Sequence, residues 1–258
     1  MAPDLSVPLL FREQRGIQML IEHEQISFEE LLVDRHSTRM ALADRVVDDL
    51  VLAARATERP ILMRAAEVLE RWDRQSNSDS RGAALFVQWA REALPQGPFT
   101  PGAFATAWDP ANPYTTPSGL GDPASAVLAL ESAATALDTQ YGSLDVSWGF
   151  ANRLRRNGLD RTGNGAPGDP LGVFSVMIFA PAEYGRRQSV FGSTYLAAVE
   201  FTLEGSRAMA HMAYGNATQP GSVHNGDQTE LLAQQEMRPV WRVRSEIEMH
   251  LEATTLIP

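Results

Sequence analysis

The spacing of hydrophobic residues changes along this chain of 258 residues, and that change limits the folds it can adopt. In residues 9–70 apolar side chains recur three and four positions apart, as in FREQRGIQMLIEHE and MALADRVVDDLVLAARA, which is typical of amphipathic helices. In the last third, GVFSVMIFA and FGSTYLAAVEFT are rich in β-branched and aromatic residues, which favours strands. Helices followed by strands predict an α+β fold with a helical first half.

Residues 1–95 are expected to form a helical layer. Ser27 and Glu30 have the spacing of a capping box for a short helix between two longer ones. Pro60 suits the first turn of the helix that continues as ILMRAAEVLERW. The polar stretch RQSNSDSRG then interrupts the helical spacing, and GAALFVQWAREAL resumes it.

Residues 96–258 are expected to start with an irregular connection and to continue with one long helix. Prolines and glycines are frequent in residues 95–123, which predicts a partly extended backbone. Asp122 can cap the following helix, with Pro123 at its first position. That helix is expected to end at Gly142.

The C-terminal third is expected to hold late sheet strands, a closing loop and a closing helix. GVFSVMIFA and FGSTYLAAVEFT are interpreted as two buried strands joined by the turn-rich loop PAEYGRRQSV, and MAHMAYG as a third strand. One helix is expected at residues 229–235. Another is expected after Ser245, because Ser245 and Glu248 again have the spacing of a capping box.

Composition excludes several classes of function. The formal net charge of −10, from 32 acidic and 22 basic residues, disfavours binding to nucleic acid, which needs a concentrated basic face. The longest apolar runs, such as residues 171–180, are shorter than the roughly 20 residues that cross a bilayer, so no membrane partner is expected. Cysteine is absent, which excludes thiol catalysis, disulfides and thiolate metal sites. Residues 1–10 lack the basic and apolar regions of an export signal, so we expect any such signal upstream of this chain.

The histidines do not predict a metal site. The five are His23, His36, His211, His224 and His250, and no two have the i, i+4 spacing of zinc ligands on a helix. The one in MAHMAYG lies on an apolar, strand-like segment and is expected to be a hydrogen-bonded residue of the core or of a sheet edge.

The polar loop YGNATQPGSVHNGDQTELL holds the residue types of a catalytic triad. Three neighbours in one loop rarely reach triad geometry, however, and the chain lacks a G-x-S-x-G motif. The preferred interpretation is structural. Asn216, Ser222, His224 and Asp227 are expected to hydrogen-bond the loop to itself and to cap the helix that starts near Gln228.

Two further segments have a chemical and a structural interpretation. Trp72, Asp73, Asp79 and Ser80 include two carboxylates that could serve acid and base chemistry, but a solvated loop with an Asp or Ser helix cap is preferred. The segment TGNGAPGDPLG has neither a G-x-G-x-x-G fingerprint nor a Walker lysine, so we expect a turn that leads into the next strand.

Four passages, in the same order along the chain, resemble the penicillin amidase family of N-terminal-nucleophile hydrolases, especially its acyl-homoserine-lactone and aculeacin acylase branch. They are LERWDRQSNSDSRGAALFVQW, YGSLDVSWGFANRLRR, GDPLGVFSVMIF with VFGSTYLAAVEF, and YGNATQPGSVHNGDQTELL with RPVW. The resemblance covers nearly the whole chain. Family members commonly have proline where Val223 stands and histidine where Asn152 stands, which bears on substrate assignment rather than on membership.

The resemblance implies the C-terminal part of a four-layer αββα fold that is cut autocatalytically into two subunits. In the family the nucleophile is a serine that opens the larger subunit, and an asparagine and a backbone amide form the oxyanion hole. These groups and the family's calcium site are expected upstream. This chain is therefore expected to hold no catalytic residue, metal or cofactor, and to form one structural unit with the upstream part.

One supporting residue is implied within the chain. The family carries an arginine at the start of the first helix after the oxyanion asparagine. Arg12 in LFREQRGIQML matches it best, with Arg15 as the competitor. Its implied role is to position that asparagine and the edge of the active site through charge-assisted hydrogen bonds. The alternative is an ordinary exposed helix arginine.

The resemblance implies an acylase that hydrolyses a linear amide bond in a small acyl amide, such as an acyl-homoserine lactone, a lipopeptide or a β-lactam antibiotic. Such activity belongs to quorum quenching or antibiotic metabolism, in the periplasm or outside the cell. This chain alone is expected to be inactive and to need the upstream acylase portion as its partner. Two alternatives are a non-catalytic complementation or binding module and a truncated remnant.

Overall fold

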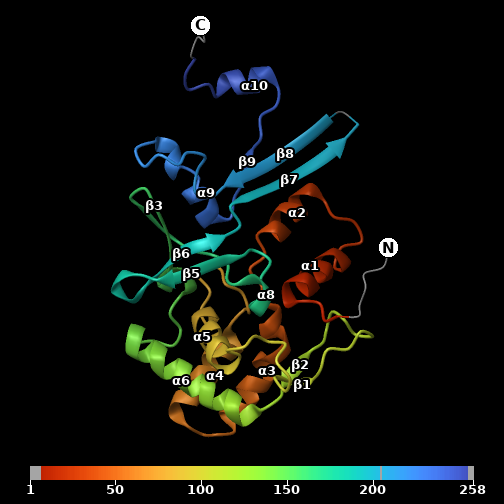
Figure 1. Ribbon diagram of the computed structural model, residues 1–258, viewed down its shortest axis with the longest axis vertical. Coiled ribbons are helices and arrows are strands. Elements are labelled where there is room, and N and C mark those ends of the chain that lie inside the picture. Colours follow the sequence, from red (N-terminus) through yellow and green to blue (C-terminus); the bar gives the residue numbers. More distant parts are fainter. Residues whose placement is uncertain (1–6, 204, 255–258) are drawn as a thin grey trace.

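The structure is a computed structural model that describes residues 7–203 and 205–254. Of residues 1–10, which lack the pattern of an export signal, residues 1–6 lie outside the described residues. Helices and strands are mixed. The helices α3 to α6 lie at one end of the molecule, the three-stranded sheet at the other, and the four-stranded sheet between them (Figure 1).

The helices predicted in the first part of the chain are present within the described residues. Its helices are α1 (Phe11–Ile21), α2 (Phe28–Arg35), α3 (Ala41–Arg55), α4 (Pro60–Arg71) and α5 (Ala83–Ala93). The capping box of α2 is confirmed, because the Ser27 hydroxyl accepts the backbone N–H of Glu30 at 3.2 Å and the Glu30 carboxylate accepts the backbone N–H of Ser27 at 2.8 Å. Pro60 occupies the first turn of α4, as predicted.

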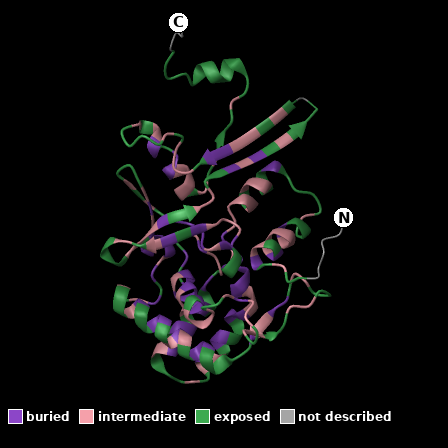
Figure 2. Cartoon of the chain, in the orientation of Figure 1, coloured by how far each residue is buried: buried purple, intermediate pink, exposed green. Residues whose placement is uncertain are grey.

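The main hydrophobic core lies between α3, α4, α5 and α6 (Pro123–Tyr141). Leu50, Leu62, Phe86 and Leu130 are each fully buried, and the inward sides of these helices are the largest buried region in Figure 2. The helix α6 follows the proline-rich connection in sequence and still packs on the earlier helices. The apolar stripes predicted from sequence therefore face one another.

The proline-rich connection is irregular and partly extended, as predicted. It contains only one short antiparallel pair, β1 (Phe104–Thr106) with β2 (Ser118–Leu120), within the described residues. At its end the Asp122 carboxylate accepts the backbone N–H groups of the first turn of α6. Gly142 ends that helix with φ +69°, a conformation that glycine adopts without strain.

Two sheets form the rest of the fold. The four-stranded sheet has the order β4–β3–β6–β5, and the three-stranded sheet has the order β7–β8–β9. The strands are β3 (Asn152–Arg156), β4 (Leu159–Thr162), β5 (Met177–Pro181), β6 (Arg187–Gly192), β7 (Tyr195–Thr202), β8 (Gly205–Met212) and β9 (Arg238–Pro239). Short helical segments between them are α7 (Trp148–Ala151), α8 (Gly168–Leu171), η1 (Glu183–Gly185) and η2 (Val223–Asn225).

The prediction for the strand region is partly wrong. FGSTYLAAVEFT, predicted as one strand, is divided between β6 and β7, which belong to different sheets. Part of the predicted loop PAEYGRRQSV belongs to β6, and β5 starts only at Met177. Composition favours extended backbone throughout this region, but the partner of each strand is decided by distant residues. MAHMAYG does contribute to a third strand, β8, which starts earlier than predicted.

The closing helices are α9 (Thr229–Gln234), close to its predicted range, and α10 (Arg244–Met249). The predicted capping box of the last helix is wrong. The N-cap is Val243, so Ser245 lies inside α10, and the Glu248 carboxylate accepts a hydrogen bond from Arg244 at 2.7 Å. No helix of the described residues is long and apolar enough to cross a membrane.

Candidate functional site

A polar cavity of about 630 Å³ opens between α2, the loop after α4, and β8. Its walls come from segments that are far apart in sequence. Leu32, Val33, Met209 and Met237 supply apolar surface. Polar residues also line it, and they are Arg15, Asp34, His36, Ser37, Gln75, Asn77, Gln235 and Glu236. A cavity of this size with both kinds of lining is typical of small-molecule sites and of surfaces that a partner completes.

Arg15 supplies the cation of this cavity. Its guanidinium forms an ion pair with Glu22 at 3.1 Å, and its side chain is only 13% exposed. Its Nε is buried and has no hydrogen-bond partner among the described residues. Arg15 therefore lines the cavity and also has one buried N–H group that is not used.

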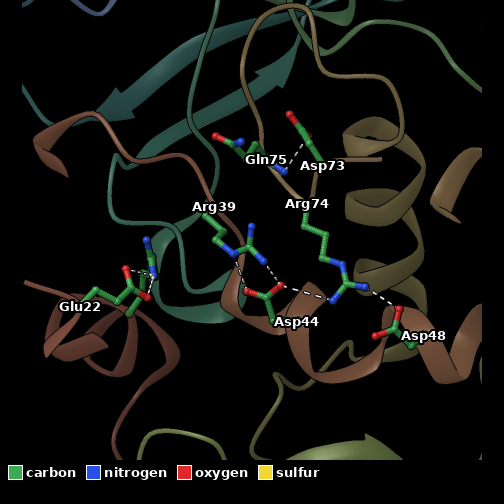
Figure 3. Close-up of polar contacts among 8 residues, drawn as sticks. Glu22, Arg39, Asp44, Asp48, Asp73, Arg74 and Gln75 are labelled. Carbon is green, nitrogen blue, oxygen red and sulfur yellow. Dashed lines mark hydrogen bonds and ion pairs between the residues drawn. The ribbon is translucent and has the colours of Figure 1, made fainter. Parts of the chain in front are cut away.

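A network of charged side chains holds the loop after α4 against the start of α3 (Figure 3). The guanidinium of Arg39 makes two hydrogen bonds to Asp44, at 2.9 and 2.7 Å, and Arg74 forms ion pairs with Asp44 and Asp48. The backbone N–H of Met40 donates to the Arg74 carbonyl at 2.9 Å. This network positions Gln75 and Asn77 in the cavity wall.

The histidines His36 and His211 stack at the edge of the cavity, with ring centroids 5.7 Å apart. Their Nδ1 atoms lie 3.0 Å from the Leu32 carbonyl and 3.2 Å from the Glu236 carbonyl, which assigns a proton to each Nδ1. Both Nε2 atoms are buried acceptors without a partner among the described residues. Burial, reinforced by the neighbouring His36, lowers the pKa of His211 to about 4, and burial also lowers the pKa of His36.

We expect acidification to destabilise the chain through His211. Its folded-state pKa of about 4 lies below the ordinary value near 6.5, so the unfolded state binds the proton more tightly. The stability that the neutral ring contributes is complete above about pH 6.5 and is lost as the pH falls toward 4. From pH 7.5 to pH 5 the loss should be about 2 kcal/mol. Urea unfolding at several pH values measures this loss. The free energy of unfolding of His211→Asn should depend less on pH than that of the original chain. Parallel pH curves for the two proteins would contradict the assignment of the loss to His211.

Arg12 lies apart from the polar cavity. Its guanidinium carbon is 5.0 Å from the centroid of the Phe174 ring, and one of its N–H groups donates to the Phe174 carbonyl at 3.3 Å. Of the two arginines weighed from the sequence, Arg15 lines the cavity and Arg12 does not. The implied supporting role of Arg12 stays a prediction.

The loop with Ser222, His224 and Asp227 has no triad geometry. The two ring nitrogens of His224 lie 2.8 Å from the Asp227 carboxylate and 2.9 Å from that of Glu252, and both contacts raise the pKa of His224. The Ser222 hydroxyl accepts the backbone N–H of His224 at 3.2 Å and does not meet the ring. With both ring nitrogens on carboxylates, His224 cannot activate this serine.

The same loop is tied to β8 through Gln228. Its backbone N–H donates to the Tyr214 carbonyl at 3.0 Å, and its side-chain oxygen accepts the Met212 N–H at 2.8 Å. The expectation that Asp227 caps α9 is wrong, because its carboxylate binds His224 instead and the N-cap of α9 is Gln228 without a side-chain bond. Asn216 is exposed at the start of the loop.

Asp73 and Asp79, in the loop after α4, do not form the acid and base pair that was considered from the sequence. Asp73 and Asp79 are both exposed, and Asp73 accepts hydrogen bonds from the Ser80 hydroxyl and the Gln75 N–H. The two carboxylates are solvated, but Trp72 and Ser80 are buried, and the N-cap of α5 is Gly82 and not an Asp or Ser. A Cβ on Gly82 would lie 2.5 Å from the Cβ of Trp72, so the packing of that ring excludes any larger cap.

One buried residue that the sequence interpretation missed connects three segments. Asn164, only 8% exposed, accepts the backbone N–H of Ser78 at 2.7 Å and donates to the Ala233 carbonyl at 2.7 Å. It lies in TGNGAPGDPLG, between two glycines, which is the one local signal of its importance. The described residues contain no group of three or more His, Asp or Glu side chains arranged to hold a metal ion.

Comparisons with known proteins found a matching family and similar relatives. The penicillin amidase family matches residues 4–249. The acyl-homoserine lactone acylase PvdQ of Pseudomonas fluorescens strain Pf-5 is 29% identical over 257 residues, which cover 96% of this chain and 32% of that protein. PvdQ of Pseudomonas putida strain KT2440 is 28% identical over 237 residues, 89% of this chain and 29% of that protein.

A solved structure is also similar. The thermostable penicillin G acylase from Alcaligenes faecalis aligns with a TM-score of 0.49 and 16% identity, over 96% of this chain and 52% of that chain. The chain spans about a third of the length of the curated relatives it matches.

Proposed function

Because this chain belongs to the penicillin amidase family, we propose that it is the C-terminal portion of an acylase that hydrolyses a linear amide bond. The observation that carries the proposal is the family match over residues 4–249, together with relatives named acyl-homoserine lactone acylases. The substrate is a small molecule with an acyl group on an amide nitrogen. Acyl-homoserine lactones, lipopeptides and β-lactam antibiotics are the candidates, and the compartment is the periplasm or the exterior of the cell.

On this proposal an upstream portion supplies the nucleophilic serine, the oxyanion asparagine and any calcium ion, and it completes a four-layer αββα fold. The outward surface of the three-stranded sheet supports the idea of a missing neighbour. Tyr195, Val199 and Phe201 on β7 are 59%, 45% and 84% exposed, and β7 pairs only with β8 among the described strands. Exposed apolar side chains on a free sheet edge favour a partner.

The polar cavity is the part of this chain that we place beside the active site. Arg15 offers a guanidinium group there, and Gln75 and Asn77 offer amides on a loop that is held by charged side chains. Such groups can orient a carbonyl or an asparagine supplied from upstream without doing the chemistry themselves. Arg15 is the candidate for a positioning role within this cavity, whereas the supporting role implied for Arg12 stays a separate prediction.

Co-expression with the upstream portion tests the proposal. Octanoyl- and dodecanoyl-homoserine lactone and a chromogenic phenylacetyl amide are offered to the chain alone, to the pair, and to a pair in which the upstream nucleophile is replaced by alanine. We expect turnover only by the intact pair. Turnover by the chain alone would refute the proposal. Stable association of the pair without turnover would favour a complementation or binding module.

A further inference from the structure

A second cavity, of about 370 Å³, lies between α1 and α2, and we call it the α1–α2 groove. Its walls are mainly apolar and include Ile17, Met19, Leu20, Ile26 and Leu31. Arg12, Arg35 and Phe174 also line it. Residues 20 and 26 flank the connection between the two helices, whereas Arg12 and Arg35 stand at their far ends, near the start of α1 and the end of α2.

The two arginines meet at Phe174. Their guanidinium carbons lie 5.0 Å and 5.3 Å from the centroid of that ring. The Nε atoms of both are buried without a hydrogen-bond partner among the described residues. Arg12 makes one side-chain hydrogen bond, to the Phe174 carbonyl, and Arg35 makes no side-chain hydrogen bond or ion pair with any described residue. Burial and the charge of Arg12 hold the pKa of Arg35 below its ordinary value.

The carboxylates of this groove are bound elsewhere. Asp34 lies 3.2 Å from Nε2 of His23, and Glu13 accepts the backbone N–H of Leu10 at 2.8 Å. Neither forms an ion pair with Arg12 or Arg35 within the part of the chain that the structure describes. Partly buried guanidinium groups are normally paired, because an uncompensated charge in a dry site is costly. The groove thus has unpaired positive charge beside an apolar wall.

We propose that the α1–α2 groove binds an aliphatic carboxylate, a site that is separate from the amide hydrolysis proposed above. The carboxylate would lie on the terminal N–H groups of Arg12 and Arg35, because the Nε atoms are buried and guanidinium groups match a carboxylate through paired hydrogen bonds. The hydrocarbon chain would lie along Ile17, Leu20 and Leu31. This contact removes apolar surface of the ligand and of the groove from water. The volume of the groove is within the range of small-molecule sites.

Calorimetric titration of the 258-residue chain with sodium octanoate, below its micellar concentration, tests the proposal. We expect saturable binding of octanoate. Octanamide keeps the hydrocarbon chain and lacks the charge, and acetate keeps the charge and lacks the hydrocarbon chain. Each should bind at least about tenfold more weakly, which is the loss expected for one charge-assisted hydrogen bond or several buried methylene groups. Equal affinity for octanamide and octanoate would overturn the proposal.

Three variants locate the site. Arg35→Gln should weaken octanoate binding about tenfold or more, whereas Arg71→Gln should leave it unchanged, because Arg71 is 74% exposed on α4. Leu20→Glu places a carboxylate on the apolar wall at a position that is 66% exposed, so the chain should still fold and bind octanoate poorly. Circular dichroism checks folding. Unchanged octanoate binding in both Arg35→Gln and Leu20→Glu would overturn the proposed site. Loss of octanoate binding when the upstream portion is present would also overturn it.

Discussion

Replacing Trp89 by alanine should destabilise the chain by about 4 kcal/mol, because large-to-small changes at a fully buried aromatic leave a cavity. The Trp89 side chain is 1% exposed, and its ring centroid lies 5.2 Å from that of Phe86. Its indole N–H donates to the Ala126 carbonyl at 3.0 Å, which joins α5 to α6 inside the core. The alanine variant loses the ring contacts and also the indole hydrogen bond that joins the two helices.

Urea unfolding measures the effect of Trp89→Ala, and two further variants separate its causes. Trp89→Phe keeps most of the ring and removes the hydrogen bond, so it should cost about 1 to 2 kcal/mol. Leu52→Ala, on α3, removes a side chain that is 67% exposed and should change stability by less than about 0.5 kcal/mol. If Trp89→Ala proved no more costly than Leu52→Ala, the core between α5 and α6 would be incorrectly described.

Alanine at Gly215 is expected to disrupt the closing loop and to cost about 3 kcal/mol. A Cβ at this position would lie 2.1 Å from the His224 carbonyl oxygen and 2.6 Å from Oδ1 of Asp227. The first atom belongs to the backbone and cannot rotate away, so the loop from His224 to Gln228 must shift. That shift would also disturb the hydrogen bond from Met212 to the Gln228 side chain, which ties the loop to β8.

Gly221 provides the control for Gly215, because it lies in the same loop and a Cβ there meets no atom within 4 Å. Gly221→Ala should leave stability within about 0.5 kcal/mol of the original chain. Thermal or urea unfolding gives the stability of each variant, and hydrogen exchange of the Met212 amide reports on the loop itself. Equal stability of the two variants, with unchanged exchange at Met212, would contradict the tight packing of this loop.

The helices could be predicted from the sequence because their signals are local. Residues three and four apart share a face, so the apolar spacing of α3, α4 and α6 showed which sides would be buried. Their ends follow from single residues: Ser27 starts α2, Pro60 starts α4, and Gly142 ends α6. These signals act within one helical turn and need no knowledge of the rest of the chain.

The strands were predicted less well because their partners are distant. The β3–β4 hairpin was missed, although Asn157 and Gly158 form its two-residue turn with positive φ angles, a recognised hairpin signal. β3 also pairs in parallel with β6, from Asn152 to Arg187. No local pattern identifies such a partner or separates β6 from β7.

The sequence shows which polar residue types the chain contains, but it does not show which of them line the polar cavity. Arg12 and Arg15 are three residues apart on one helix, and only the placement of α2, the loop after α4, and β8 decides that Arg15 enters the cavity while Arg12 meets Phe174. His36 and His211 stack although 175 positions separate them. The sequence by itself determined the mixed fold class, the helices and the family resemblance, because periodicity and motifs are properties of neighbouring residues. The tertiary structure decided which charged groups are paired, buried or free, because desolvation and ion pairing depend on atoms brought together from distant parts of the chain.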